Sequence, residues 1–361
     1  MTKVKLSDIC RIKYGKDHKK LNDGNIPVFG SGGIVRYADA ALSNGPSVLI
    51  PRKGTLGNLF YADEPFWTVD TLFWTEIDTR RVHPKYLYYT LKNKNLAALN
   101  IGTAVPSLSV DVLNEIELDL PKFEVQSKVV HLLNLLDGKI DFNNQINDYL
   151  AKLVSLEFEK QFGANTPAVD LSNVLDISTK TVKPQDYMEE IWEHYSIPAF
   201  DEARWPTFEP ANKIKSNKYV IDGNCILISK LNPSIKRLWI PPCITSHSVC
   251  STEFIVYKPK KPEYKSFYNA AIDSDSFSNY LLQHVTGSTG SRQRSQPKAT
   301  LTYPIPNPDE KQIAFFCAFA DPIYNQIRNN EIECQKLKTL RDLLLPKLVT
   351  GEINSSVIDI M

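Results

Sequence analysis

The longest regular pattern of apolar residues lies between Leu120 and Phe162, and a related pattern returns between Ile305 and Ile353. In both stretches apolar residues recur at steps of three and four, which is the spacing of one face of an α-helix. The members are Val129, Leu132, Leu133, Leu136, Ile140, Ile146, Leu150, Leu153 and Val154 in the first stretch, and Ile313, Phe316, Ala320, Ile323, Ile327, Asn330, Cys334, Leu337 and Leu340 in the second. These stripes predict either two helices paired as a coiled coil or two amphipathic helices within one core.

Shorter apolar runs, bounded by glycine, proline and polar residues, precede each long stretch, and such runs are typical of β-strands. Strands are expected over 26–34, 47–51 and 66–74 in the first half, and over 196–200, 219–231, 238–240 and 248–257 in the second. Shorter helices are expected over 84–99 and 266–284. The chain therefore belongs to the α+β class, with strand-rich α/β-mixed segments alternating with long helices.

The same order of features occurs twice, which indicates an internal repeat. Gly102-Thr103 precedes Pro121 by the same interval as Gly287-Ser288 precedes Pro306, and KLSDI at 5–9 is echoed by DLSNV at 170–174. Each proline is expected to open a helix, because proline is favoured in the first helical turn. The repeat predicts a domain at 1–121, a helix at 122–164, a second domain at 165–305, and a second helix with a C-terminal tail at 306–361. This arrangement is a pseudo-twofold internal repeat.

Composition narrows the class of protein. A chain of 361 residues is long enough for two or three domains with their own cores. It has no apolar run long enough to cross a membrane, and MTKVKLSDIC lacks the apolar segment of a signal peptide. Its six cysteines show no disulfide-framework spacing, so free thiols in the cytoplasm are expected. Cys225, Cys243, His247 and Cys250 contain no CxxC pair, which disfavours a zinc site.

Several short motifs imitate enzyme signatures without completing them. GSGG at 30–33 is not a dinucleotide-binding GxGxxG, and no GxxxxGK[ST] motif for ATP is present. NPSI at 232–235 lacks the second proline and the aromatic ring that would stack on a flipped base. No Ser/His/Asp set can be nominated. The sequence thus predicts a non-catalytic protein that needs no cofactor.

Basic residues gather in polar loops of both halves. They are Lys16, Lys19, Lys20, Arg52 and Lys53 in the first half, and Lys230, Lys236, Arg237, Arg292 and Arg294 in the second. A single basic loop is usually ordinary solvated surface, and the formal net charge of +1 neither supports nor excludes nucleic acid. Basic turns at matching places in both repeats nevertheless predict phosphate contacts, and the arginines can also read guanine O6 and N7.

The chain resembles the specificity subunit of type I restriction–modification enzymes over nearly its whole length. The resemblance rests on GTAVPSL (102–108), LPKFEVQ (120–126), LLDGKIDFNN (135–144), ISKLNP (228–233), CSTEF (250–254), TGSTGSRQR (286–294) and LLPKLVTGEI (344–353). It departs from the family at Glu310-Lys311, where Glu-Gln is usual unless Gln312 supplies it, and at Pro322 within the second helix.

The resemblance implies two target-recognition domains separated by two long antiparallel coiled-coil helices. Each domain would bind one half of a split double-stranded DNA site. The helices would set the distance between the domains and dock two methyltransferase subunits, to which restriction/translocase subunits attach. Two alternatives remain: a non-catalytic coiled-coil scaffold that binds other proteins through its repeated globular domains, and a fused restriction-enzyme fragment. Chain length disfavours the fragment.

Each long helix carries an asparagine on its apolar stripe near mid-length, Asn143 in the first and Asn330 in the second. If the helices are antiparallel, the two amides are expected to meet and to fix the register, so Asn143→Leu should raise thermal stability. A continuous helix of about 38 residues spans roughly 57 Å. Kinks or breaks at Gly138 and Pro322 would leave straight portions of about 36 Å, close to the roughly 34 Å of one DNA turn.

Overall fold

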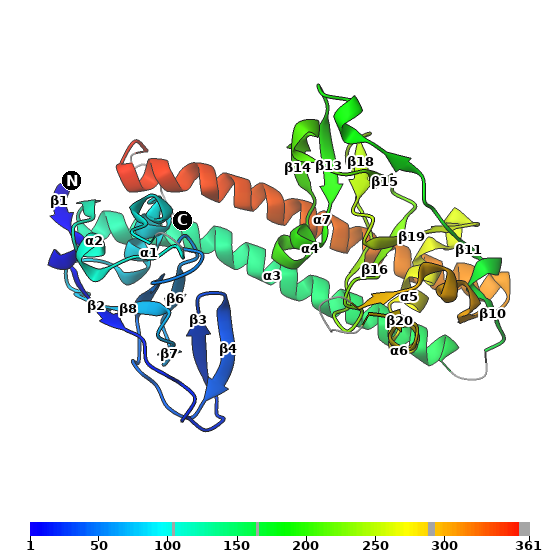
Figure 1. Cartoon of the computed structure of the whole chain (residues 1–361), viewed down its shortest axis with the longest axis horizontal. Coiled ribbons are helices and arrows are strands. Elements are labelled where there is room, and N and C mark those ends of the chain that lie inside the picture. Colours follow the sequence, from blue (N-terminus) through cyan, green and yellow to red (C-terminus); the bar gives the residue numbers. More distant parts are fainter. Residues whose placement is uncertain (103–104, 164–165, 288–292, 354–361) are drawn as a thin grey trace. The chain divides into compact units, whose positions relative to one another are not determined.

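The computed structural model describes residues 1–102, 105–163, 166–287 and 293–353. The chain is a mixture of helix and sheet, as predicted, and divides into two compact units. Unit 1 comprises residues 1–140 and 335–361, and unit 2 comprises residues 141–334. The division falls inside both long helices, α3 (Phe123–Phe162) and α7 (Glu310–Thr350), so each unit contains part of each (Figure 1).

Unit 1 is built on three small sheets (Figure 1). The largest has the order β2-β8-β5-β6, the second has the order β4-β3-β7, and the third pairs β1 with β9. The strands are β1 (Thr2–Lys5), β2 (Cys10–Tyr14), β3 (Ile26–Gly30), β4 (Gly33–Ala38), β5 (Ser47–Pro51), β6 (Phe60–Ala62), β7 (Trp67–Thr68), β8 (Leu72–Ile77) and β9 (Glu117–Leu120). Two shorter helices, α1 (Pro84–Lys92) and α2 (Val110–Asn114), complete the unit.

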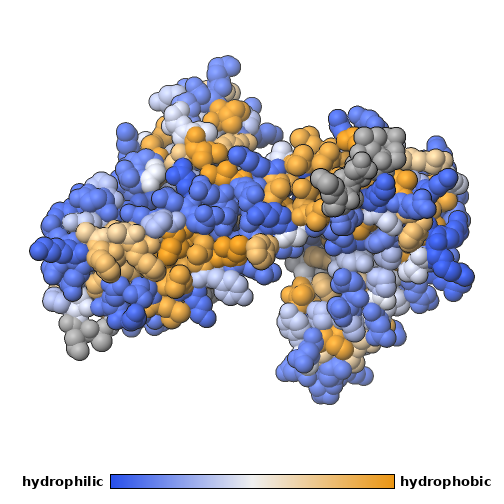
Figure 2. Space-filling model, turned by 180° about the vertical axis from the view of Figure 1, so that it is seen from behind, coloured by the Kyte–Doolittle hydropathy of each residue, from blue (hydrophilic) through white to orange (hydrophobic). Residues whose placement is uncertain are grey.

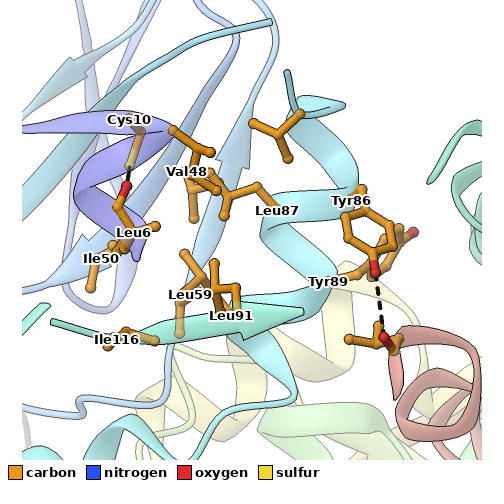
Figure 3. Close-up of a cluster of buried hydrophobic side chains, with 14 of the residues drawn as sticks. Leu6, Cys10, Val48, Ile50, Leu59, Tyr86, Leu87, Tyr89, Leu91 and Ile116 are labelled. Atoms are coloured by element: carbon orange, nitrogen blue, oxygen red, sulfur yellow. Dashed lines mark hydrogen bonds between the residues drawn. The ribbon is translucent and has the colours of Figure 1, made fainter. Parts of the chain in front are cut away.

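The core of unit 1 lies between the β2-β8-β5-β6 sheet, α1 and the two long helices. Val48 and Ile50 of β5 belong to this core with Tyr86 and Leu87 of α1, and all four side chains are at most 1% exposed. Leu87 points toward Val48, whereas Tyr86 points to the other side of α1 (Figure 3). Leu345, Leu348 and Val349 of α7 complete the cluster. Tyr86 donates through its hydroxyl to the carbonyl of Val349 at 3.4 Å, which ties α1 to α7.

Unit 2 contains a four-stranded sheet, β11-β19-β16-β17, and a five-stranded sheet, β12-β15-β18-β13-β14. Two further pairs join β10 to β22 and β20 to β21. The strands are β10 (Ala168–Asp170), β11 (Leu175–Ile177), β12 (Thr181–Val182), β13 (Ile191–Tyr195), β14 (Thr207–Pro210), β15 (Lys218–Val220), β16 (Ile226–Ser229), β17 (Leu238–Trp239), β18 (Ser248–Cys250), β19 (Phe254–Pro259), β20 (Val285–Thr286), β21 (Arg294–Ser295) and β22 (Pro304–Pro306). Its shorter helices are α4 (Ile197–Ala203), α5 (Lys265–Ile272) and α6 (Asp275–Gln283).

The two units share an arrangement of strands. In the sheet β2-β8-β5-β6 of unit 1, neighbouring strands are the first, fourth, second and third of the four in sequence. The sheet β11-β19-β16-β17 of unit 2 has the same order. The similar segments at 5–9 and 170–174 play the same part in each. Leu6 donates its backbone N–H to Ile116 and Leu171 donates to Tyr303, both at 2.9 Å, and both leucine side chains are fully buried.

The two long helices are antiparallel within each unit. In unit 1, Arg341 of α7 donates to Asp137 of α3 at 2.7 Å. In unit 2, Asn143 of α3 donates to Glu333 of α7 at 2.7 Å, and Asn147 donates to the carbonyl of Ile327 at 3.3 Å. The partner number falls as the α3 number rises, which defines the antiparallel direction.

Of the two possibilities for the long helices, the structure has the continuous one, because both helices run without a break through Gly138 and Pro322. Two other expectations about these helices need correction. The helices begin at Phe123 and Glu310, since Pro121 and Pro306 lie at strand ends. Leu153 and Leu340, which were assigned to the buried stripes, are 46% and 45% exposed.

Three strand predictions in unit 2 need correction. The expected strands at 219–231 and 248–257 each divide into two strands of different sheets, β15 with β16 and β18 with β19. The segment Ser196–Phe200 was expected to be a strand but belongs to the start of α4. The hydroxyl of Ser196 accepts a hydrogen bond from the backbone N–H of Ala199 at 3.2 Å, and Pro198 lies in the first turn. A serine N-cap and an early proline are both helix-start signals, and they outweigh the short apolar run.

Candidate nucleic-acid interface

The first group of basic residues lies in the loop that joins β2 to β3 in unit 1. Lys16, Lys19 and Lys20 are exposed. The backbone N–H of Lys16 donates to Thr68 at 2.9 Å and its carbonyl accepts from the Trp67 indole at 3.0 Å, which fixes the loop against β7. Gly15 is required here, because a Cβ at this position would lie 2.0 Å from the carbonyl oxygen of Val69.

Arg52 and Lys53 follow β5 in a turn that approaches the same edge of unit 1. Arg52 donates to the carbonyl of Asp70 at 3.4 Å, and its guanidinium lies 5.4 Å from the centre of the Tyr14 ring. Gly54 takes φ +94°, a conformation that favours glycine and turns the chain immediately after the two basic residues. Lys53 is exposed.

A surface hollow of about 530 Å³ links these loops. It is lined by Lys19, the glycine turn at 30–32, and Asp70-Thr71, whose backbone binds Arg52. Asp17 also lines the hollow, and the backbone N–H of Lys19, which donates to it at 3.0 Å, lowers the pKa of its carboxyl. Unit 1 thus brings the loops of Lys16–Lys20 and Arg52-Lys53 to one edge, together with two acidic residues that limit their net charge.

In unit 2 the basic residues differ in what they can reach. Lys230 is half-buried and continues β16, where its backbone pairs with Glu253 and Ser295. Arg294 binds Glu253 through two nitrogens at 3.0 and 3.2 Å, and this hydrogen-bonded carboxylate raises the pKa of the arginine. The Arg294 side chain stays 44% exposed. Arg292 lies outside the described residues.

Arg237 and Lys236 are bound within unit 2, and the assignment of Arg237 to a DNA-contacting surface is corrected. Arg237 is 7% exposed and donates to both carboxylate oxygens of Asp201, at 2.6 and 2.8 Å. A bidentate pair of this kind fixes the side chain. Lys236 forms a 2.6 Å ion pair with Asp273 at the end of α5 and also donates to the backbone carbonyl of that residue.

The two stripe asparagines are buried, at 1% and 5% exposure, but they do not bind each other. Asn143 donates to Glu333, whereas Asn330 donates to Asn147 at 2.8 Å and accepts from Gln326 at 2.7 Å. The expected amide pair is therefore corrected to two separate contacts between α3 and α7.

Apolar residues on the projecting hairpin β3–β4 were missed from the sequence. Ile34, Val35 and Tyr37 are 49%, 55% and 52% exposed, and Tyr14 on the adjoining β2 is 55% exposed. Exposed aromatic and β-branched side chains beside basic loops suit contact with base edges or methyl groups. Strand alternation was the available signal, but it does not show which face of a hairpin is covered.

The described residues contain neither a metal-binding group of side chains nor a helix suited to crossing a membrane. No group of three or more His, Cys, Asp or Glu side chains there is placed to hold a metal ion. Cys225 and Cys250 are instead buried in an apolar cluster with Trp239 and Phe254, and burial raises the pKa of the Cys225 thiol to about 11. Among the same residues, no helix combines the length and apolarity that membrane crossing requires.

Comparison with known proteins places the chain in a family. Residues 1–152 match the type I restriction modification DNA specificity domain. A Mycoplasma pneumoniae protein described as the N-terminus of a type I specificity subunit is 30% identical over 139 residues, covering 36% of this chain and 74% of that protein. The MjaIX type I restriction enzyme specificity subunit of Methanocaldococcus jannaschii is 22% identical over 85% of this chain and 77% of that subunit. The chain belongs to the family of type I restriction–modification specificity subunits.

The fold agrees with this assignment. The type I restriction-modification S subunit from M. genitalium superposes with a TM-score of 0.59 over 96% of both chains, at 17% identity. The alignments with two further M. pneumoniae specificity subunits span 45% and 59% of those proteins.

Proposed function

We propose that the protein is the non-catalytic, cytoplasmic DNA-specificity subunit of a type I restriction–modification complex, and that each unit recognises one half of a split double-stranded site. The observation that carries the proposal is the repeated sheet order, with basic loops attached to it in both units. Two similar readers in one chain make the second binding step intramolecular, which raises the affinity for a two-part site.

Different residues serve affinity and sequence reading in this proposal. Lys16, Lys19 and Lys20 are exposed on a backbone-anchored loop, and flexible ammonium groups there suit phosphates. Arg52 and Arg294 are held by a carbonyl and a carboxylate respectively, so their guanidinium groups are oriented in advance. An oriented guanidinium suits bidentate contact with guanine.

The long helices are proposed to pair as a coiled coil that separates the recognition domains and docks two methyltransferase subunits, to which restriction subunits attach. Apolar residues Phe142, Tyr149 and Leu156 occur at every seventh position of α3 and are 58%, 72% and 53% exposed. This spacing places them on one face of the helix, together with Leu153. Figure 2 shows a band of hydrophobic residues flanked by hydrophilic ones on the face that it presents.

The decisive experiment maps methylated sites in DNA from cells that co-express this chain with a methyltransferase subunit of the same system. A split motif is expected. Replacing residues 168–304 with the matching segment of another specificity subunit should change one half of the motif only. Change in both halves, or in neither, would contradict separate recognition by the two units.

The alternative is a scaffold that binds other proteins through its globular units, and the exposed apolar residues of α3 are compatible with it. Salt dependence separates the two functions. Binding to DNA releases counterions, so the logarithm of the affinity falls steeply with the logarithm of salt concentration. A scaffold would show no DNA binding with such a slope. A fused restriction-enzyme fragment would instead show nuclease activity in the isolated chain.

A further inference from the structure

A cavity of about 530 Å³ lies within unit 2, and its lining includes Lys236 of the basic loops but not Lys230 or Arg294. It is bounded by the end of α4, by β17 and the prolines that follow it, by α5, and by the middle of α7. Its volume lies within the range of small-molecule pockets in proteins, about 300–1,000 Å³. Neither the comparisons nor the proposed function assigns it a role.

Two side chains that line the cavity carry buried polar atoms without a hydrogen-bond partner among the described residues. Asn269 of α5 is 2% exposed; its side chain hydrogen-bonds to Tyr324, but its Oδ1 accepts no hydrogen bond from the described residues. Trp239 of β17 is 3% exposed and its indole Nε1 donates none. A buried polar atom that is left unsatisfied destabilises the fold, so a ligand that satisfies it gains affinity. Two residues of the cavity lining thus each carry one unsatisfied polar atom, an acceptor on Asn269 and a donor on Trp239.

The wall also offers rings and no excess charge. Phe200, Trp239 and Tyr324 supply aromatic surface. The lining contains four basic residues, Arg204, Lys236, Lys265 and Arg328, and four acidic residues, Glu263, Asp273, Asp321 and Glu331. Lys236 is paired with Asp273, and Lys265 and Arg328 each donate to a backbone carbonyl. This balance suits an uncharged or zwitterionic ligand better than a polyanion.

We propose that this cavity binds a nucleoside-like ligand: an uncharged heteroaromatic ring with a hydrogen-bond donor and an acceptor at its edge. Asn269 Oδ1 receives the ring N–H, Trp239 Nε1 donates to a ring nitrogen or carbonyl, and Tyr324 contributes aromatic surface. The same chemistry is available from a free nucleoside or from an unstacked base of DNA. The proposal stands independently of the split DNA site.

The test uses the full chain and saturation-transfer NMR with calorimetry against adenosine, guanosine, cytidine and uridine. At least one is expected to bind with a Kd of about 1 mM or lower, and adding a 5′-phosphate should not strengthen it. Asn269→Leu should weaken binding at least about tenfold. Ala151→Phe, which adds a ring to the cavity lining from α3 and leaves Asn269 and Trp239 unchanged, should do the same. Asn329→Leu, an exposed change on α7 outside the cavity wall, is the matched control and should have no effect.

The two sources of the ligand give different results. If free nucleosides do not bind but single-stranded oligonucleotides do, and both cavity variants weaken them, the ligand is a base of DNA. If neither nucleosides nor oligonucleotides at about 5 mM respond to the cavity variants, the cavity holds only solvent and the proposal fails. Thermal unfolding of Ala151→Phe and Asn269→Leu shows whether a loss of binding reflects loss of the fold. If both variants are folded and still bind the ligand, the proposal is overturned.

Discussion

The side-chain amide of Asn143 donates to the Glu333 carboxylate at 2.7 Å, so a buried asparagine of α3 is held by an acid of α7. Asn330, the other asparagine on the apolar stripes, binds Asn147. These contacts lie about one helical turn apart on each helix. Sliding one helix past the other would separate both pairs. The register of the two helices is therefore fixed by polar contacts within stripes that are otherwise apolar.

Because Asn143 is bound to Glu333, Asn143→Leu is expected to lower stability and not to raise it. Asn143→Leu removes a charge-assisted hydrogen bond from Glu333, so the free energy of unfolding is expected to fall by about 1–3 kcal/mol. Urea denaturation measures the change, and Gln145→Leu on the exposed side of α3 is the control. A double-mutant cycle with Glu333→Ala should give a coupling of at least about 0.5 kcal/mol. Higher stability of Asn143→Leu would show that this contact does not stabilise the fold.

Arg237 and Arg294 are expected to separate stability from specificity. Arg237→Ala removes two hydrogen bonds to Asp201 and buried packing, so it should cost about 2 kcal/mol in unfolding without changing the DNA sequence recognised. Arg294→Ala should leave stability within about 0.5 kcal/mol, because its pair is exposed. It should relax specificity at one base position by about 1–3 kcal/mol. Equal losses on specific and random DNA for Arg294→Ala would contradict base reading.

The loop lysines of unit 1 are expected to act on all DNA sequences alike. Lys19→Ala with Lys20→Ala should weaken binding to specific and random duplexes equally. The salt slope should fall by about 2, because each lysine neutralises one phosphate in the complex. Shift assays at several salt concentrations measure this, and Lys215→Ala, an exposed lysine of unit 2 outside the basic loops, is the control. A selective loss on the specific site would assign base contacts to these lysines.

Glu331 is expected to make stability depend on pH. Burial raises the pKa of its carboxyl to about 7 from an ordinary value of 4.5, although Arg204 and Arg328 act in the opposite direction. The folded state therefore holds the proton more tightly, and the penalty for ionisation grows as pH rises from 4.5 to 7 and is complete above it. Glu331→Gln should stabilise the protein at pH 8 by up to about 3 kcal/mol, and the gain should vanish near pH 4.5. Glu159→Gln, which is exposed, should show neither effect; a gain that persists unchanged at pH 4.5 would exclude ionisation as its cause.

The long helices were predictable from the sequence because their apolar spacing is enforced by local geometry, and the family was predictable because motifs along the chain resemble it. Apolar residues at steps of three and four identify a helix, whatever the helix packs against. The helices α3 and α7 begin within a few residues of the expected positions. The start of α7 is fixed by a reciprocal pair: Gln312 N–H donates to Asp309 at 2.9 Å and Asp309 N–H donates to Gln312 at 3.2 Å. Gln312 therefore lies in the first turn of α7, one residue later than the glutamine of the usual Glu-Gln pair.

The fate of individual basic residues was not predictable, because it depends on partners that are distant in sequence. Arg237 and Lys236 are neighbours in one polar loop, yet Asp201 of α4 binds the first and Asp273, which follows α5, binds the second. No local pattern places those carboxylates. The expected pairing of the two stripe asparagines was wrong for a related reason: the stripe specifies the face of a helix but not the axial offset between two helices.

The last prediction concerns the proposed spacing role of α3 and α7. Four residues inserted in α3 after Asn144, together with four inserted in α7 after Glu331, lengthen both helices by about 6 Å, which corresponds to about two base pairs. The paired insertion is needed because α3 alone would lose register with α7 at Asn147 and Asn330. Methylation mapping should then show a longer spacer between unchanged half-sites. As a control, four glycine–serine residues placed between Lys215 and Ser216, in a loop of unit 2, should leave the spacer as it was. A paired insertion variant that folds, methylates DNA and keeps the original spacer would show that these helices do not set the distance.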